Sequence, residues 1–268
     1  FVPGTVYEWT NSNTAIGLAA SGTGNISFTG TNSGTSPITG TIVATPKFGN
    51  SVNGNILSNG GFESGSLGAW ILAGANSGAG CDQGFQLYTG DVNACGFGTA
   101  TCGPTFNYTQ PQGTYGISGA FDGAGPLGRE FRQAITLPAS LSSASLSFMN
   151  QFDVDLQTFC SGCTGARIFE VNLLNAAGTS VLTNLYNVTL NPGQKHCQPW
   201  TMQNTNVLSA LAPYLGQNAM ISFKLTIPEA FTGPGWIAFD SIALNLTGGV
   251  ACTGTPISFP ITINPTPT

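Results

Sequence analysis

The chain has 268 residues, of which 6 are Lys or Arg and 11 are Asp or Glu, so charged residues make up only 6% of it. A nucleic-acid partner would need a clustered basic face to neutralise phosphates, and six scattered cations cannot build one. The longest apolar runs, WIL and GWIAF, are far shorter than the roughly 20 residues that span a bilayer, so the sequence predicts no membrane segment. This length allows one large all-β domain or two ordinary domains.

Two strand-like segments come first along the chain. Residues 26–32 (ISFTGTN) and 38–46 (ITGTIVATP) are rich in β-branched residues, and the turn formers between them predict a β-hairpin. The stretch that follows, KFGNSVNGN, fills with Gly, Asn and Ser and is typical of a loop or a domain boundary. Because the chain opens FVPGTVYEW, without an initiating Met or a signal sequence, we expect a piece of a longer protein.

The middle of the chain contains longer strand-like runs. They lie at residues 144–154, 167–175, 181–190, 220–228 and 235–245. Turn signals separate them, and this pattern predicts an all-β sandwich or jelly roll. Residues 206–216 (NVLSALAPYLG) have helical spacing, with Gly216 as a possible cap and Pro213 limiting the length. Residues 257–265 (ISFPITINP) predict a last strand.

The two ends of the chain resemble one type of repeat. Residues 7–46 contain WTNSNTAIGLAASGTG and the strand end TIVATP, and residues 248–268 read GGVACTGTPISFPITINPTPT. Together and in this order they resemble the PKD-like, immunoglobulin-like repeats of the giant surface adhesins of gliding bacteria, exported by the type IX system. The resemblance covers about a quarter of the chain. It implies a role in cell adhesion and gliding motility, as one repeat of a tandem array at the bacterial cell surface.

The spacing between these two ends departs from the family. There the strand ending in TxTP passes through a short link into VACTGTP, whereas here about 200 residues separate the two. We therefore expect an all-β chain in which an immunoglobulin-like β-sandwich repeat, residues 1–47 and 248–268, is split by an inserted domain at 48–247. Exposed loop tips accept such insertions when the termini of the inserted domain lie close together. Neighbouring repeats of the same long chain would be partners of the host repeat.

The inserted segment resembles the galactose-binding-like jelly rolls of carbohydrate-binding modules. NGGFE near its start and FDSI in its last strand carry the resemblance. In that family the first and last strands lie near each other and often hold a structural calcium ion, which takes six to eight oxygen ligands. Asn59, Glu63 and Asp240 match the positions that supply such oxygens. The alternative is that both carboxylates bind backbone amides at strand ends.

The seven cysteines favour an oxidising, extracellular setting, where disulfides persist. Six of them suggest three disulfides of open connectivity: Cys81, Cys95, Cys102, Cys160, Cys163 and Cys197. The seventh, Cys252, lies alone near the end of the chain, and we expect it to be unpaired. The alternative is a tetrahedral zinc site made by Cys160, Cys163, His196 and Cys197, although a second close ligand pair at zinc-finger spacing is missing.

Aromatic residues beside amides and acids are the candidates for ligand binding. Sugars present flat C–H faces that pack on aromatic rings, and hydroxyls that need directed hydrogen bonds. Tyr88, Tyr108 and Trp200 lie in loop-like, Cys-rich segments, where binding residues usually occur. The polar candidates beside them are Asp82, Asp91, Asn107 and Gln110. Trp70 and Trp236 lie in the first and last strands of the insert, and we expect both in the core.

The sequence lacks the parts of common hydrolases. It has no GxSxG motif, and His196 is its only histidine. A glycosidase needs two carboxylates, which Asp153 with Asp155 or Glu229 could supply, but a solvated pair at a strand end is the commoner reason for such a pattern. We therefore expect an adhesin segment that binds a surface polysaccharide or glycan and is not an enzyme. The alternatives are a structural spacer and a filament subunit that assembles through its terminal strands.

Overall fold

A computed structural model describes most of the chain. It covers residues 5–48, 52–74, 84–89, 102, 107–121, 125–160, 162–229, 235–248 and 252–266. The chain divides into two compact units, Phe1–Ser51 with Gly249–Thr268, and Val52–Gly248. We call the first the split unit and the second the sandwich unit. In the part of the chain described, no helix is long and apolar enough to cross a membrane.

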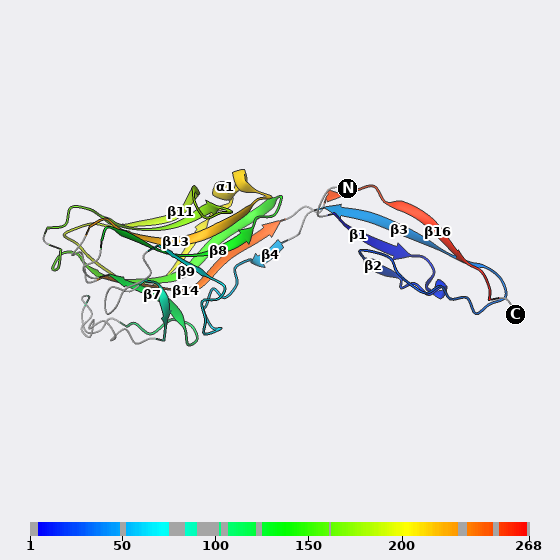
Figure 1. Ribbon diagram of the computed structural model, residues 1–268, viewed down its shortest axis with the longest axis horizontal. Helices are drawn as coiled ribbons and strands as arrows, with labels where there is room; N and C mark the ends of the chain where they lie inside the picture. Colours follow the sequence, from blue (N-terminus) through cyan, green and yellow to red (C-terminus); the bar gives the residue numbers. More distant parts are fainter. Residues whose placement is uncertain are drawn as a thin grey trace. The chain divides into compact units, whose positions relative to one another are not determined.

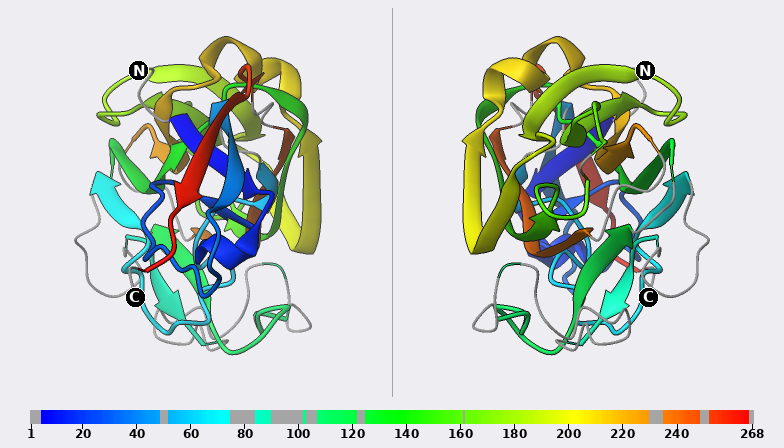
Figure 2. Two further views of the ribbon diagram at one scale, coloured as in Figure 1. Left: turned by 90° about the vertical axis from the view of Figure 1, so that its right-hand side faces the viewer. Right: turned by 90° about the vertical axis from the view of Figure 1, so that its left-hand side faces the viewer.

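The split unit is built on one antiparallel sheet. Its elements are β1 (Thr5–Asn11), η1 (Thr14–Ile16), β2 (Ser21–Thr23), β3 (Ile38–Phe48), β15 (Cys252–Thr253) and β16 (Ile257–Ile263). Strand β3 pairs with β1 on one side and with β15 and β16 on the other, and β2 pairs with β1. Figure 2 shows β16, in red, beside β3, in light blue. Segments from opposite ends of the sequence therefore share one sheet.

The expected hairpin between residues 26–32 and 38–46 is wrong. Residues 26–32 form no strand, because β1 on one side and β15 with β16 on the other already occupy both edges of β3. The segment packs on the small core of this unit instead, through Ile26 and Phe28. Asn32 fixes its far end, since its side-chain amide donates to the backbone oxygen of Ile263 at 2.9 Å.

The sandwich unit consists of two antiparallel sheets, and Figure 1 shows their long strands. The five-stranded sheet has the order β11 (Val181–Leu190), β10 (Arg167–Asn175), β13 (Asn218–Ile227), β8 (Leu127–Thr136), β5 (Ile71–Gly74). The six-stranded sheet has the order β12 (Lys195–Asn206), β9 (Leu141–Asp155), β14 (Gly235–Gly248), β7 (Gly116–Phe121), β6 (Gln86–Tyr88), and β4 (Val52–Asn55) also pairs with β14. The expected all-β class is confirmed.

Phenylalanine rings fill the space between the two sheets. Phe131 stacks on Phe223 within the five-stranded sheet at 4.9 Å, and Phe169 of that sheet lies 4.8 Å from Phe239 of the other. Trp70 joins this core, 4% exposed, as expected. Burial of such side chains contributes about 1.5 to 3 kcal/mol each, so this layer holds the two sheets together.

All five of the long middle runs form strands, but two neighbouring segments differ from expectation. Residues 195–206 form strand β12, although the sequence around Trp200 looks like a loop. The expected helix is short: α1 spans Leu208–Leu211 and continues only as the 3-10 helix η3 (Ala212–Tyr214). Pro213 explains the early end, because its ring clashes with a continuing α-helix and it has no backbone N–H.

Candidate ligand-binding face

Strand β14 separates the core of the sandwich unit from a second buried layer. Successive side chains of a strand point to opposite faces of the sheet. Ile237 and Phe239 belong to the core between the sheets, while Trp236 and Ala238 belong to a separate cluster. That cluster lies on the opposite side of the six-stranded sheet, which we call the outer face. Trp236 is buried, as expected, but in this second cluster and not between the two sheets.

Four aromatic rings gather on the outer face: Tyr88, Tyr108, Trp200 and Trp236. The ring centroids of Tyr88 and Tyr108 lie 5.6 and 5.0 Å from that of Trp236, both edge-to-face, and Trp200 is parallel to Tyr88 at 6.5 Å. Trp236 is only 2% exposed and forms the floor, whereas Tyr108 and Trp200 are half-buried. The structure thus brings the three predicted ligand aromatics together.

A β-bulge places Trp200 in this cluster. The pairing of β12 with β9 shifts register between Gln198 and Thr201, so the β12 strand carries one extra residue at that point. Bulges locally bend a strand and re-aim its side chains. Sequence reasoning found Trp200 but put it on a loop, because Cys, Pro and His interrupt the strand pattern around it.

A buried carboxylate orients one of the rings. Asp153 is 0% exposed, lies opposite Trp236 in the sheet, and accepts hydrogen bonds from the Tyr108 hydroxyl and from the backbone N–H of Cys102 at 3.1 Å. Burial, followed by this contact with Asp153, raises the pKa of Tyr108, so its hydroxyl stays a donor at neutral pH. Asp153 therefore holds Tyr108 in position.

Asp155 is buried beside Asp153 and is also occupied by protein groups. Its carboxylate binds Lys195 Nζ at 2.7 Å and accepts from the backbone N–H groups of Gln157 and Thr158. Burial alone would raise the pKa of Asp155, but these contacts hold it below its usual value. The expectation of a solvated strand-end pair is wrong, because both carboxylates lie inside the protein. Glu229, the third candidate, accepts from two backbone amides and Arg167.

Several polar atoms around the cluster lack a partner in the part of the chain that the structure describes. These are Trp200 Nε1, Gln151 Oε1 and Gln110 Oε1. Gln151 uses its other amide atom to donate to the backbone oxygen of Asn107 at 2.6 Å, and the Asn107 side chain is exposed. Buried polar groups are normally paired, so these atoms are exceptions among the described residues, and Asn107 is the polar candidate that solvent can reach.

Two of the predicted calcium residues, Glu63 and Asp240, contact the segment 112–115, and Asp240 lies within β14. The two oxygens of Glu63 accept from the backbone N–H of Thr114 at 3.0 Å, and Asp240 accepts from those of Gln112 and Ser241. A β-carbon at Gly113 would lie 2.3 Å from the Glu63 carboxyl carbon, so only glycine permits this approach. The carboxylates thus bind backbone amides, as in the alternative reading of the sequence.

Glu63 is nonetheless close enough to Asp240 to affect it. Burial first, and then the charge of Glu63, raises the pKa of Asp240 to about 6. A β-carbon at Gly61 would lie 3.8 Å from Asp240 Oδ1 and 3.9 Å from Glu63 Cγ, so Gly61 lies against both side chains. Asn59 is engaged locally, because its side chain binds the backbone of Ser64 and Ser66. In the described residues, no three His, Cys, Asp or Glu side chains form a metal-binding group.

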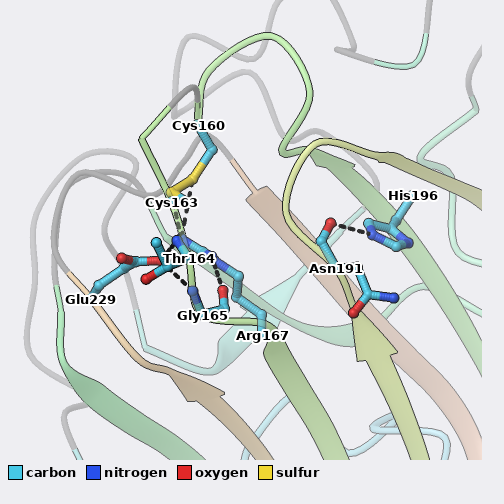
Figure 3. A network of polar contacts seen from close by, with 8 residues as sticks. All are labelled: Cys160, Cys163, Thr164, Gly165, Arg167, Asn191, His196 and Glu229. Atoms are coloured by element: carbon cyan, nitrogen blue, oxygen red, sulfur yellow. Dashed lines mark hydrogen bonds and ion pairs between the residues drawn. A yellow bond between two sulfur atoms is a disulfide. The ribbon is translucent and has the colours of Figure 1, made fainter.

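Two of the expected disulfides are present. Cys102 pairs with Cys197, which ties the segment beside Tyr108 to β12, and Cys160 pairs with Cys163. The zinc alternative is wrong, because disulfide sulfurs are not thiolates and His196 Nε2 instead lies 3.1 Å from the backbone oxygen of Asn191 (Figure 3). Four predicted residues lie outside the described part: Cys81, Cys95, Asp82 and Asp91. Cys252 begins β15, and the state of its side chain is likewise not described.

No protein-family model and no curated protein matches the chain. Solved structures with a similar fold include TmCBM61 in complex with beta-1,4-galactotriose, at 14% identity and a TM-score of 0.42, covering 72% of this chain and 98% of that one. Another is the family 11 carbohydrate-binding module from Clostridium thermocellum, at 12% identity and a TM-score of 0.36, covering 74% of this chain and 98% of that one. A third is the Stig cyclase Fisc from Fischerella sp. TAU, at 16% identity and a TM-score of 0.42, covering 74% of this chain and 98% of that one. Likeness at this level identifies neither a ligand nor a reaction, so function must be argued from the residues.

Proposed function

We propose that the sandwich unit binds a polysaccharide or glycan on its outer face. The observation that carries the proposal is the gathering of Tyr88, Tyr108 and Trp200 over Trp236, away from the core between the sheets. Binding pockets for small ligands combine apolar and aromatic surface with a few placed polar groups. A sugar ring fits this combination, because it offers C–H faces to the rings and hydroxyls to the polar atoms.

In this proposal each part of the face has a role in recognition. The half-buried rings of Tyr108 and Trp200 contact the sugar, while Trp236 and Asp153 hold them in place. The exposed side-chain amide of Asn107 offers hydrogen bonds to the sugar hydroxyls. No bond is made or broken, so the mechanism is binding alone.

Calcium enters the proposal as a structural ion held by Glu63 and Asp240. A cation there would offset the burial and like-charge effects that raise the pKa of Asp240. Calcium takes six to eight oxygens, so the two carboxylates would need help from neighbouring oxygens, such as the Gln112 side-chain oxygen that binds the Ser241 hydroxyl. The side-chain oxygen of Asn59 already accepts from the backbone N–H of Ser64, so in this proposal Asn59 stabilises the turn that carries Glu63.

We further propose that the split unit is a PKD-like repeat of a cell-surface adhesin that displays the sandwich unit outside the cell. Support comes from its formation out of both ends of the sequence and from the two disulfides, which persist in oxidising compartments. A repeat of this kind contacts neighbouring units of the same chain and supplies spacing.

One observation favours a second candidate, self-association through β16. This strand pairs with β3 on one side, and it exposes Ile257 at 65% and Phe259 at 38%. Apolar residues on an edge strand promote pairing with another chain. Light scattering after size-exclusion chromatography, across a range of protein concentrations, would reveal such assembly, and an unchanging monomer mass would reject it.

The test of glycan binding is affinity electrophoresis through a panel of polysaccharides in millimolar calcium, repeated with chelator. Wild type should be retarded by at least one polysaccharide. Trp200→Ala should bind about 30-fold more weakly or worse, since truncating an aromatic residue that carries binding energy costs about 2 kcal/mol or more. Met202→Ala is the matched control, because Met202 is 55% exposed on the same strand and is not among the members of the aromatic cluster. Absence of retardation across the panel, or equal binding by Trp200→Ala, would reject the proposal.

A further inference from the structure

A buried arginine lies directly against the Cys160–Cys163 disulfide. Arg167, the first residue of β10, is 0% exposed, and its Nη2 donates to Cys160 Sγ at 3.3 Å and to Cys163 Sγ at 3.2 Å (Figure 3). Its Nη1 donates to the backbone oxygen of Gly165 and lies 3.4 Å from Glu229 Oε1. The guanidinium is always charged in proteins, so a full positive charge sits beside two neutral sulfurs.

This charge is incompletely compensated by the groups that the structure describes around it. Glu229 also accepts from the backbone N–H groups of Thr164 at 3.1 Å and Gly165 at 3.0 Å, and its side chain is 29% exposed. Arg167 Nε has no partner in the described part of the chain. Burial lowers the pKa of Arg167, which Glu229 opposes. A thiolate at either sulfur would supply the missing negative charge, through a charge-assisted hydrogen bond.

One of the two sulfurs can be approached from outside. Cys160 is 5% exposed, whereas Cys163 is half-buried. Gly162 next to it is exposed, and a β-carbon there would meet no atom within 4 Å. Phe159 is 51% exposed beside Cys160 and offers an apolar contact to an incoming molecule. Attack at Cys163 would make Cys160 the leaving group, and a leaving thiolate stabilised by a cation departs faster.

We propose that Cys160–Cys163 is a thiol–disulfide exchange site that accepts two electrons from an external dithiol, with Arg167 holding the Cys160 thiolate. The dithiol is a small molecule or a pair of nearby cysteines in an exposed protein segment. Its first thiolate attacks Cys163 Sγ, the bond between the two sulfurs breaks, and Cys160 leaves as a thiolate on Arg167 Nη2. Its second thiolate then attacks its own sulfur in the mixed disulfide and releases Cys163, which takes one proton. The dithiol ends as a disulfide, and its second proton goes to solvent.

The test uses the full oxidised chain and dithiothreitol as the dithiol, under native conditions. Samples are quenched with an alkylating agent at intervals, and mass spectrometry of peptides gives the reduction rate of each disulfide. Arg167→Met should slow reduction of Cys160–Cys163 about 10-fold or more, because the leaving thiolate loses its cation. Glu229→Gln should accelerate it, since the guanidinium then has no competing carboxylate. Arg132→Met, an arginine that binds Gly178 and Glu130 elsewhere in the unit, is the matched control and should change nothing.

The Cys102–Cys197 disulfide serves as an internal monitor of folding in the same samples. A variant that merely loosens the fold would speed up reduction of both disulfides, which is opposite to the effect expected for Arg167→Met. If Arg167→Met proves unfolded, acceleration in Glu229→Gln, specific to Cys160–Cys163, supports the proposal. Three results would overturn the proposal. They are a reduction rate of Cys160–Cys163 in folded Arg167→Met equal to that of wild type, a rate in Glu229→Gln unchanged from wild type, and no reduction of this disulfide in wild type until the chain unfolds.

Discussion

The six-stranded sheet buries both of its faces, but with different chemistry. On the inner face, Phe239 and Ile237 pack against the opposite sheet in a cluster made mainly of phenylalanine and aliphatic side chains. On the outer face, Trp236 packs against Tyr88 and Tyr108, and the carboxylate of Asp153 lies in the same layer. The inner face therefore gains mainly from apolar burial, whereas on the outer face hydroxyl, amide and carboxylate groups must also be satisfied.

This difference shows why burial by itself does not separate a core from a binding face. Trp236 at 2% exposure and Phe239 at 0% are equally inaccessible, and they are three residues apart on one strand. The difference is in their neighbours: the cluster around Trp236 includes polar atoms, and some of these lack a partner among the described residues. We expect variants on the inner face to lose stability, and variants on the outer face to lose binding.

The largest effect on stability should come from the bridge across the outer face. Cys102 and Cys197 lie 95 residues apart, and closing so long a loop stabilises by about 4.7 kcal/mol in the chain-entropy model. Replacing both by Ala should lower the free energy of unfolding by this order, as measured by urea denaturation. The matched control is the double Ala variant at Cys160 and Cys163, whose 3-residue separation predicts only about 2 kcal/mol. Equal losses would show that loop length does not govern these bridges.

Removing a ring from the inner face should have the next largest effect. Phe239→Ala should cost about 3 to 5 kcal/mol, because it deletes a fully buried ring that contacts several other phenylalanines. Phe159→Ala, at a position 51% exposed, should change the free energy of unfolding by no more than about 0.5 kcal/mol. Urea denaturation monitored by tryptophan fluorescence gives both values. A loss below 1 kcal/mol in Phe239→Ala would contradict the proposed core.

Asp240 should make stability depend on pH in the absence of calcium. Its pKa in the folded chain is about 6, against an ordinary value of 3.8, so between these pH values the native state binds more protons than the unfolded state. Stability should therefore fall as pH rises from about 4 to above 6, by at most about 3 kcal/mol. Asp240→Asn should remove this slope, and added calcium should raise the stability of wild type at pH 7.5. A flat profile in chelator would contradict the raised pKa, and no response to calcium would reject the ion.

Apart from the control variants, Trp200→Ala, at the edge of the outer face, should have the smallest effect on stability. Trp200 is half-buried and reaches the cluster from a bulge, so Trp200→Ala should cost about 1 kcal/mol in the free energy of unfolding. The same variant should nevertheless lose most of the affinity for polysaccharide. If instead its stability fell as far as that of Phe239→Ala, Trp200 would belong to the core and the two faces would not differ as we argue.

Much of the sandwich unit could be predicted from the sequence because its strands are regular. Strands β10 and β11 have the predicted bounds, since β-branched and apolar residues recur along their whole length with no Gly or Pro between them. Strand β12 was missed, because Cys, Pro and a register shift interrupt its pattern. The segment 26–32 has the composition of a strand but forms none, because strand formation also needs an unoccupied edge, which composition does not report.

The outer face was predictable in part. Tyr88, Tyr108 and Trp200 were singled out as aromatics in Cys-rich segments, but nothing local shows that they meet. Trp236 is buried as expected, and strand alternation could have told which face it is on, because it has the opposite parity to Ile237 and Phe239. Asp153 was expected to be solvated, although it likewise alternates with the core residues Phe152 and Val154. Their pairing across β9 and β14 depends on register, which a single sequence does not reveal.

The most direct test of the account is hydrogen–deuterium exchange of the chain with and without an oligosaccharide cut from the polysaccharide that binds best. We expect slower exchange in residues 107–118 and 195–203, which carry Tyr108 and Trp200 on the outer face, and no change in residues 167–190 of the opposite sheet. Protection confined to that opposite sheet, or to the split unit, would contradict the claim that the outer face is the ligand-binding face.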